Sequence, residues 1–156
     1  MFKQFLVILM LALFSMPAFA KSHLHIHPLT NKELQCLSLN AYHEARGDGY
    51  EGMQAVIDVT LNRSESGLYP KNICAVVYQK NQFSWTSDKT LHVKDIQTYN
   101  LAKFIALEAS KGQGRGSTHG ALFFHSSKIK SKFDSKLTYS GKIKNHLFYR
   151  NMLTMR

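Results

Sequence analysis

Acidic residues are scarce in this chain, in which ten Asp and Glu are set against twenty Lys and Arg, for a formal net charge of +10. A field of this sign favours a polyanionic partner over a neutral one. The basic residues are spread along the chain and form no stripe, which argues against a nucleic-acid-binding module. A non-enzymatic basic module that binds an anionic envelope surface stays open as an alternative.

Long apolar runs are also lacking, apart from residues 5–16. This run is shorter than the roughly 20 residues that a membrane-spanning helix needs. Lys3 precedes it, and an Ala-Phe-Ala stretch follows it with the small-x-small spacing that signal peptidase reads. We therefore expect a secretory signal at residues 1–20, a mature chain from Lys21 in the periplasm or the medium, and no stable membrane anchor. An uncleaved anchor is the alternative.

Cysteine occurs only at Cys36 and Cys74, without the CxxC or Cys/His spacing of a redox motif or a zinc knuckle. In an exported chain we expect the two residues to form one disulfide, because oxidising compartments let such pairs persist. Two buried free thiols are the alternative.

Apolar residues at helical spacing dominate the first two thirds of the chain. They predict helices at residues 31–46, 51–65 and 95–111, with a shorter helix at residues 70–78. Thr30 lies three residues before Glu33, which is a capping-box pattern at the start of the first helix. The preceding residues, 21–29, have no periodicity and are expected to form a flexible lead-in.

The pattern becomes extended near the end of the chain. Residues 120–126 read as a buried strand, and residues 136–150 read as a hairpin with Ser140 and Gly141 as the turn. Helices followed by a small antiparallel sheet predict a single α+β domain at residues 30–156.

Glu44 is the acid best placed for chemistry. It lies in the last predicted turn of the first helix, where the negative end of the helix dipole raises the pKa of a carboxyl group. A half-buried Glu with a raised pKa is a suitable general acid for protonating a glycosidic oxygen. An exposed carboxylate paired with a Lys or Arg is the structural alternative.

A second carboxylate would decide the type of reaction. Glycosidases that add water usually carry two carboxylates, and Asp48, Glu51 and Asp58 are the candidates here. If Glu44 acts alone, it can serve in turn as acid and base while the sugar's own hydroxyl attacks, which is lytic transglycosylation.

Gln54, Asp58 and Asn62 recur every four residues and therefore share one face of the second predicted helix. Together with Arg63 they either orient Glu44 or form an ordinary polar helix face.

Four ordered blocks resemble the cell wall hydrolase family that includes the spore cortex-lytic enzymes: YHEARGDGYEGMQAVIDVTLNR, YPKNICAVVYQKNQFSW, GALFFH and NHLFYR. The resemblance implies a lysozyme-like α+β catalytic domain that cuts the glycan strands of peptidoglycan as a lytic transglycosylase. It also implies that Glu44 is the acid, and we expect a monomer that needs no cofactor. Asp48 replaces the last Glu of the family's usual EARGE, a departure that concerns that carboxylate and not Glu44.

The remaining blocks suggest how a sugar would be bound. Gln82 and Ser84 could donate or accept hydrogen bonds with N-acetyl groups, and Trp85 or Phe83 could stack on a sugar face, unless these aromatics only anchor their loop. The strand GALFFH would form the floor of a cleft. The further candidates for substrate binding or for orienting Glu44 are His43, Arg46, Asp48, Gln54, Asp58, Phe124, His125 and His146.

Two metal-binding alternatives remain. HEARG begins like the HExxH helix of zinc peptidases and amidases, but Gly47 takes the place of the second His, so a metal would have to recruit His125 or His146. A mature chain that begins Lys-Ser-His could also bind Cu(II) or Ni(II) through His23, with His25 and His27 nearby, unless these residues form an ordinary tail.

Overall fold

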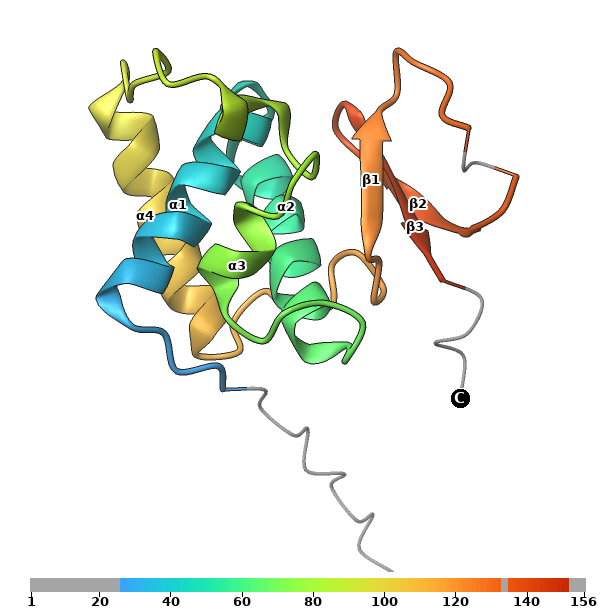
Figure 1. Cartoon of the computed structure of the whole chain (residues 1–156), viewed down its shortest axis with the longest axis horizontal. Coiled ribbons are helices and arrows are strands. Elements are labelled where there is room, and N and C mark those ends of the chain that lie inside the picture. The colour runs from blue at the N-terminus through green and yellow to red at the C-terminus, as the bar shows by residue number, and fades with distance from the viewer. Residues whose placement is uncertain (1–25, 133–134, 152–156) are drawn as a thin grey trace, which may run out of the picture.

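The computed structural model describes residues 26–132 and 135–151, which form a helical layer and a small sheet (Figure 1). No helix in these two ranges is long and apolar enough to cross a bilayer. The predicted signal at residues 1–20 and the predicted metal ligand His23 lie outside the described residues. The elements are α1 Asn31–Ala45, α2 Gly49–Glu65, α3 Ile73–Val77, α4 Ile96–Ser110, β1 Phe123–Ser126, β2 Thr138–Ile143 and β3 His146–Arg150, with 3-10 turns at Arg46–Asp48 and Ser84–Ser87.

The start of α1 confirms the capping-box prediction. The Thr30 hydroxyl accepts a hydrogen bond from the Glu33 backbone N–H, and the Glu33 carboxylate accepts one from the Thr30 backbone N–H. These bonds satisfy amides that a helix start otherwise leaves unpaired. α1 then runs for four turns and leads directly through the 3-10 turn into α2, at Gly49, whose φ of +66° suits glycine.

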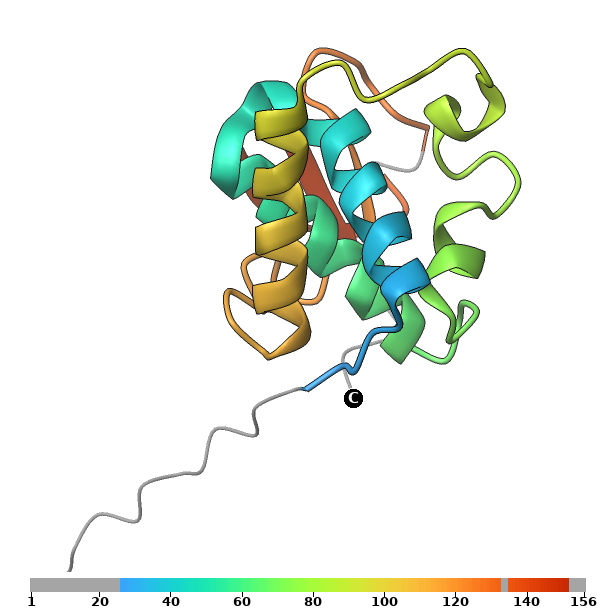
Figure 2. The same cartoon turned by 90° about the vertical axis from the view of Figure 1, so that its left-hand side faces the viewer.

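The core lies between α1, α2 and α4, which run side by side (Figure 2). Leu37 from α1, Ile57 from α2 and Ile105 from α4 are all at most 1% exposed. Each such side chain contributes roughly 1.5–3 kcal/mol through its burial. Cys36 and Cys74 form the predicted disulfide, which joins α1 to α3.

The sheet is antiparallel with the order β1-β3-β2. Phe124 of β1 pairs with Phe148 of β3, and both pack toward the helices. The predicted turn at Ser140 and Gly141 is wrong, because both residues lie inside β2 and the chain reverses at residues 144–145. Gly141 instead marks a shift of register opposite β3, the other role that glycine commonly plays in strands.

The last residues of the predicted lead-in are tied to the domain. The backbone N–H of His27 donates a 2.8 Å hydrogen bond to the Ser110 carbonyl at the end of α4, and its ring nitrogen lies 3.5 Å from a Glu65 carboxylate oxygen. Leu29 packs against the core. The prediction of a flexible segment therefore does not hold for residues 26–29.

Candidate active site

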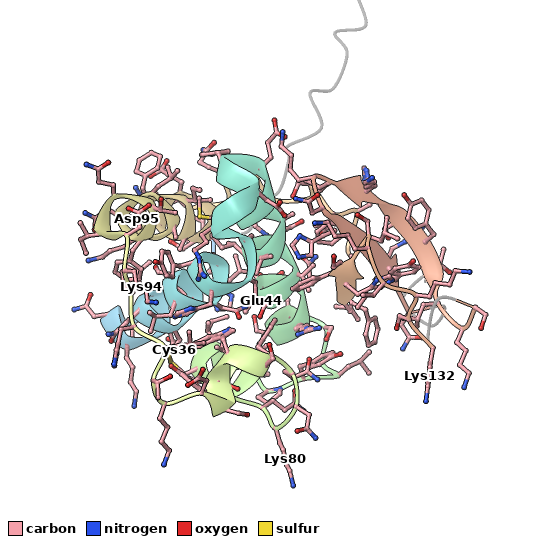
Figure 3. The ribbon with its side chains drawn as sticks, turned by 90° about the horizontal axis from the view of Figure 1, so that it is seen from above. Cys36, Glu44, Lys80, Lys94, Asp95 and Lys132 are labelled. Atoms are coloured by element: carbon pink, nitrogen blue, oxygen red, sulfur yellow. A yellow bond between two sulfur atoms is a disulfide. The ribbon has the colours of Figure 1, made fainter. Side chains whose placement is uncertain are left out.

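Glu44 lies half-buried in the last turn of α1, between the helices and the sheet (Figure 3). It opens onto a cavity of about 440 Å³, called the Glu44 cleft below, which is lined by His43, Glu44, Arg46, Ser84, Trp85, Asp88 and Leu91. Burial raises the pKa of the Glu44 carboxyl group to about 7, although the positive charge of Arg63 opposes the shift. The carboxyl group can therefore hold a proton at neutral pH and still face the cleft.

Arg63 of α2 supplies a positive charge near this carboxyl group from within the core. It is only 5% exposed, and its Nε donates a 2.7 Å hydrogen bond to the Leu122 carbonyl. Its guanidinium carbon lies 5.2 Å from the ring centre of Tyr69 and 5.4 Å from that of Phe83. These contacts fix the charge, so the attraction between Arg63 and an ionised Glu44 depends little on side-chain motion.

Trp85, the one tryptophan of the chain, forms a wall of the Glu44 cleft. Its ring stacks on His43 with centroids 4.6 Å apart, and its indole N–H donates a 3.1 Å hydrogen bond to the Asn40 side-chain oxygen. The Asn40 amide in turn donates to the Thr60 hydroxyl at 3.2 Å, and that hydroxyl donates to the Val56 carbonyl. A buried chain of hydrogen bonds thus anchors the cleft loop to α1 and α2.

Replacing Asn40 with Leu is expected to destabilise the protein by about 1–3 kcal/mol, because the buried hydroxyl of Thr60 and the indole N–H of Trp85 both lose their partner. Cleavage should weaken as well, since Trp85 is no longer held against His43. Thermal unfolding measures the first effect, and the emission of the single tryptophan reports the second. Trp85→Phe, which keeps a ring beside His43, is the matched control; unchanged emission and stability in Asn40→Leu would contradict this account.

The QFSW loop divides into cleft residues and a core residue. Ser84 and Trp85 line the Glu44 cleft as expected, whereas Gln82 lies one turn earlier, outside this lining. Phe83 is only 4% exposed and packs 6.2 Å from the Phe124 ring. Phe83 therefore anchors the loop and is not available to stack on a sugar. Phe124 packs against the core and against Phe148, so it supports the cleft from below.

Asp48 binds the sheet. Its carboxylate accepts a hydrogen bond from the Asn145 side-chain amide at 2.5 Å and lies 2.8 Å from Nδ1 of His146, and its side chain is 6% exposed. Gly52 makes room for this arrangement, because a side chain at position 52 would collide with Asp48. Asp48 and His146 therefore join the start of α2 to the β2–β3 turn, and neither is a free group in the Glu44 cleft.

The polar stripe of α2 also has a different role from the one expected. The Asp58 carboxylate, 1% exposed, accepts hydrogen bonds from the backbone N–H groups of Gly116 and Thr118 and pairs with Arg115. Asn62 donates to the Ala121 carbonyl at 3.1 Å. The stripe binds the glycine-rich segment that leads into β1, so its carboxylate is committed there and does not orient Glu44.

Gln54 and His125 also lie away from Glu44. Gln54 is in close contact with the backbone at Gly114, where any side chain would collide with it. Side chains alternate along a strand, so His125 points away from the helices, toward Tyr149, with Nε2 3.3 Å from the Tyr149 hydroxyl. Glu51 forms an exposed 2.7 Å ion pair with Lys144.

Asp88 is a site residue that sequence reasoning missed. It shares the Glu44 cleft, and its carboxylate accepts hydrogen bonds from the Thr90 hydroxyl at 2.6 Å and the Thr90 backbone N–H at 2.9 Å. These bonds lower the pKa of the Asp88 carboxyl group. Nothing in the polar stretch around it singled this residue out, because the fold alone brings it opposite α1.

The described residues hold no group of three His, Cys, Asp or Glu side chains arranged to bind a metal ion. His43 and Glu44 of the HEARG sequence lie in the cleft, while His125 and His146 have the partners given above.

Residues 47–149 match the model of the cell wall hydrolase family. The chain is 31% identical over 83 residues to a spore cortex-lytic enzyme of Bacillus subtilis, a match that covers 53% of this chain and 26% of the relative. It is 36% identical over 83 residues to the corresponding protein of Oceanobacillus iheyensis, covering 53% and 29%. The chain thus spans little more than a quarter of the length of these curated relatives.

Solved structures match over a larger share of the chain. The catalytic domain of the germination-specific lytic transglycosylase SleB from Bacillus anthracis is 27% identical, with a TM-score of 0.67 over 78% of this chain and 97% of that domain. The catalytic domain of the Bacillus cereus SleB protein is 25% identical, with a TM-score of 0.68 over 84% and 100%. These likenesses confirm the predicted lysozyme-like α+β fold. The family match covers more than half of the chain, which therefore belongs to the cell wall hydrolase family.

Proposed function

We propose that the protein cleaves the glycan strand of peptidoglycan as a lytic transglycosylase, with Glu44 as the single catalytic acid and base. The observation that carries this proposal is a half-buried carboxyl group whose pKa is raised to about 7, facing a cavity with a tryptophan wall. A group with such a pKa can give up a proton and accept one at the same pH. The similarity to catalytic domains of SleB proteins supports the choice of substrate.

The proposed reaction has two proton transfers. Protonated Glu44 donates its proton to the glycosidic oxygen while the bond from that oxygen to the anomeric carbon breaks. The resulting carboxylate then takes a proton from a hydroxyl of the same sugar as this hydroxyl attacks the anomeric carbon. The product is an anhydro sugar, and Glu44 is protonated again. Arg63 stabilises the carboxylate between the two steps.

Hydrolysis is the second candidate reaction, and Asp88 is the observation that favours it. Among the carboxylates considered from the sequence, Asp48 and Asp58 are bound elsewhere and Glu51 pairs with Lys144. Asp88 shares the cleft with Glu44 and has a lowered pKa, so the two acids are held in opposite protonation states. Such a pair could activate a water molecule.

Digestion of purified peptidoglycan separates these reactions. Lytic transglycosylation releases muropeptides about 18 Da lighter than hydrolytic ones, because no water is added. We expect the lighter products from the wild type and none from Glu44→Gln, with Asp88→Asn still active. Full-mass reducing ends that disappear in Asp88→Asn would instead establish hydrolysis. Activity lost on dialysis against a chelator would favour the zinc peptidase or amidase alternative.

The rate should depend on pH through Glu44. The acid acts in its protonated form, and the protonated fraction falls as the pH rises through a pKa of about 7. We therefore expect kcat/KM to fall about tenfold per pH unit above roughly pH 7.5. Initial rates on soluble glycan strands between pH 5 and 9 measure this. A rate that stays flat up to pH 9 would contradict the role of Glu44 as the acid.

The cellular setting follows from the same reading. We propose an exported monomer that acts on peptidoglycan in the periplasm or the medium, without a cofactor or a stable membrane anchor after signal cleavage. Binding of Cu(II) or Ni(II) at His23 is a separate proposal. A copper titration of a chain that begins at Lys21 should then give a visible d–d band, which a His23→Ala variant should lack.

A further inference from the structure

A second cavity adjoins the Glu44 cleft and has no part in the reaction proposed above. Its volume is about 300 Å³, and it shares Arg46 and Leu91 with the cleft. We call it the Lys94 pocket. The two cavities are therefore separated by no more than one side chain. The pocket is lined by Tyr42, Arg46, Gly47, Leu91, His92, Lys94, Asp95 and Thr98.

Tyr42 builds the Lys94 pocket. The Tyr42 hydroxyl accepts hydrogen bonds of 3.1 Å from the backbone N–H groups of both Lys94 and Asp95. The Arg46 guanidinium carbon lies 5.3 Å from the centre of the same ring. Because Tyr42 is only 1% exposed, it holds the segment before α4 and the arginine in fixed positions. The pocket is thus part of the folded core and not a gap between mobile side chains.

The free charge of the pocket is positive. Arg46 and Lys94 are both exposed cations at its wall. The carboxylate of Asp95 is committed to the start of α4, where it accepts hydrogen bonds from the backbone N–H groups of Gln97 and Thr98 and from the Thr98 hydroxyl. Lys94 and Asp95 lie together on one side of Glu44 (Figure 3). The pocket is therefore suited to an anionic group that carries its own hydrogen-bond acceptors.

We infer that the Lys94 pocket binds a carboxylate of the stem peptide that the muramyl sugar carries, an inference that rests on the proposed function. A strand cut at the anomeric carbon of a muramyl sugar brings that sugar, and the peptide attached to it, beside Glu44. The peptide has to leave the Glu44 cleft over one of its walls. Arg46 lies at the wall where an anionic peptide meets two cations, so the enzyme prefers peptide-bearing strands to bare ones.

The test compares two soluble substrates, un-cross-linked glycan strands that carry stem peptides and the same strands stripped of peptide by an amidase. Cleavage is measured as kcat/KM on each, and the ratio of the two is the readout. We expect the wild type to prefer peptide-bearing strands and Lys94→Gln to lower the ratio about fivefold, the upper range for one partly exposed charge pair. The backbone N–H of residue 94 that binds Tyr42 is kept in this variant, so the fold should be intact, as thermal unfolding can verify.

Lys103→Gln is the matched control, because it removes the same charge from an exposed position of α4 outside the pocket. Its ratio should equal that of the wild type. A ratio unchanged in Lys94→Gln, or lowered equally in Lys103→Gln, would overturn the inference while leaving the proposed function intact. A wild type that cleaves neither substrate would overturn the proposed function itself.

Discussion

Glu44→Gln is expected to lower the rate of peptidoglycan cleavage by at least a hundredfold and by up to about ten-thousandfold. General acid catalysis contributes on this scale, and an amide of the same shape cannot donate a proton to the glycosidic oxygen or accept one from the attacking hydroxyl. The rest of the Glu44 cleft does not change, since Trp85 is held through Asn40. Binding of glycan strands should therefore change far less than the rate.

The measurement is the initial rate of product release from soluble glycan strands, together with binding of the same strands to each variant. Glu51→Gln is the matched control, because it makes the same substitution at an exposed residue that pairs with Lys144. This control should keep its activity within about twofold, as surface ion pairs contribute little. A Glu44→Gln protein that cleaves within tenfold of the wild type would show that another group is the acid.

The same substitution should stabilise the protein at alkaline pH. Glu44 has a pKa of about 7 in the folded chain against 4.5 for an ordinary Glu, so the folded state binds protons more tightly and loses stability as the pH rises from 4.5 to 7. Glu44→Gln removes this loss, and we expect it to be more stable than the wild type by about 2 kcal/mol at pH 8. Denaturant unfolding at pH 8 and pH 4.5 should show the gain only at the higher pH.

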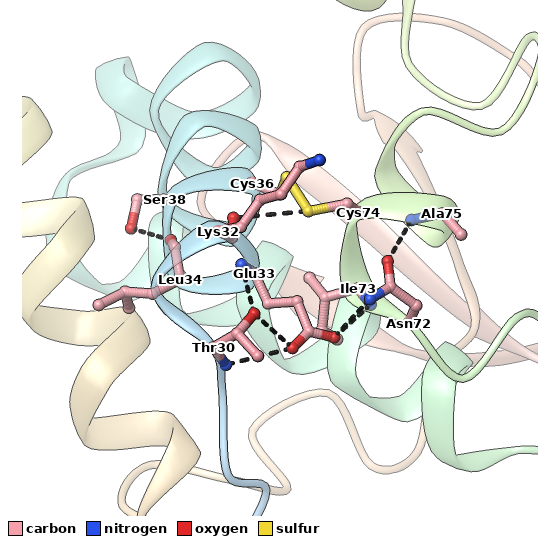
Figure 4. The surroundings of a disulfide bond; sticks show 10 residues. All are labelled: Thr30, Lys32, Glu33, Leu34, Cys36, Ser38, Asn72, Ile73, Cys74 and Ala75. Atoms are coloured by element: carbon pink, nitrogen blue, oxygen red, sulfur yellow. Dashed lines mark hydrogen bonds between the residues drawn. A yellow bond between two sulfur atoms is a disulfide. The ribbon is translucent and has the colours of Figure 1, made fainter.

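Loss of the disulfide is expected to be the largest stability effect. Cys36 and Cys74 close a loop over a sequence separation of 38, and the chain-entropy estimate for such a loop is about 4 kcal/mol. The bond joins α1 to α3 beside a second connection, in which the Glu33 carboxylate accepts hydrogen bonds from Asn72 and Ile73 (Figure 4). That connection is largely exposed, so it cannot replace a covalent link.

A Cys36→Ser, Cys74→Ser double variant should therefore unfold about 10–15 °C below the wild type. The wild type measured in a reductant should show the same drop, whereas the double variant should not respond to the reductant at all. Equal melting temperatures for the oxidised wild type and the double variant would mean that the disulfide does not constrain the unfolded chain.

Local signals were enough to predict the helices and the position of Glu44. The capping box of Thr30 and Glu33 is a contact within four residues, and the apolar spacing of α1 reflects which face is buried. The Glu44 prediction also depended only on the end of this helix. These features follow from neighbours in the sequence, so they could be predicted before the fold was known.

Features that depend on distant partners were predicted poorly. Ser140 and Gly141 resemble a turn, and only the pairing of β2 with β3 shows that Gly141 lies at a register shift. Phe83 looks like a sugar-stacking residue until the guanidinium of Arg63 is seen to cover its ring. Asn40 was missed because its partner Trp85 lies 45 residues away. An isolated polar residue on a helix has no sequence pattern that distinguishes a buried anchor from a solvated side chain.

The most direct test of this account is a titration of the Glu44 carboxyl group itself. NMR of the protein with 13C-labelled Glu side chains, assigned by comparison with Glu44→Gln, follows each carboxyl carbon from pH 3 to pH 9. The account predicts that the Glu44 signal titrates with a midpoint near 7, because burial disfavours the charged form. A midpoint near the ordinary Glu value of 4.5 would contradict it, since the carboxyl group would then carry almost no proton at neutral pH.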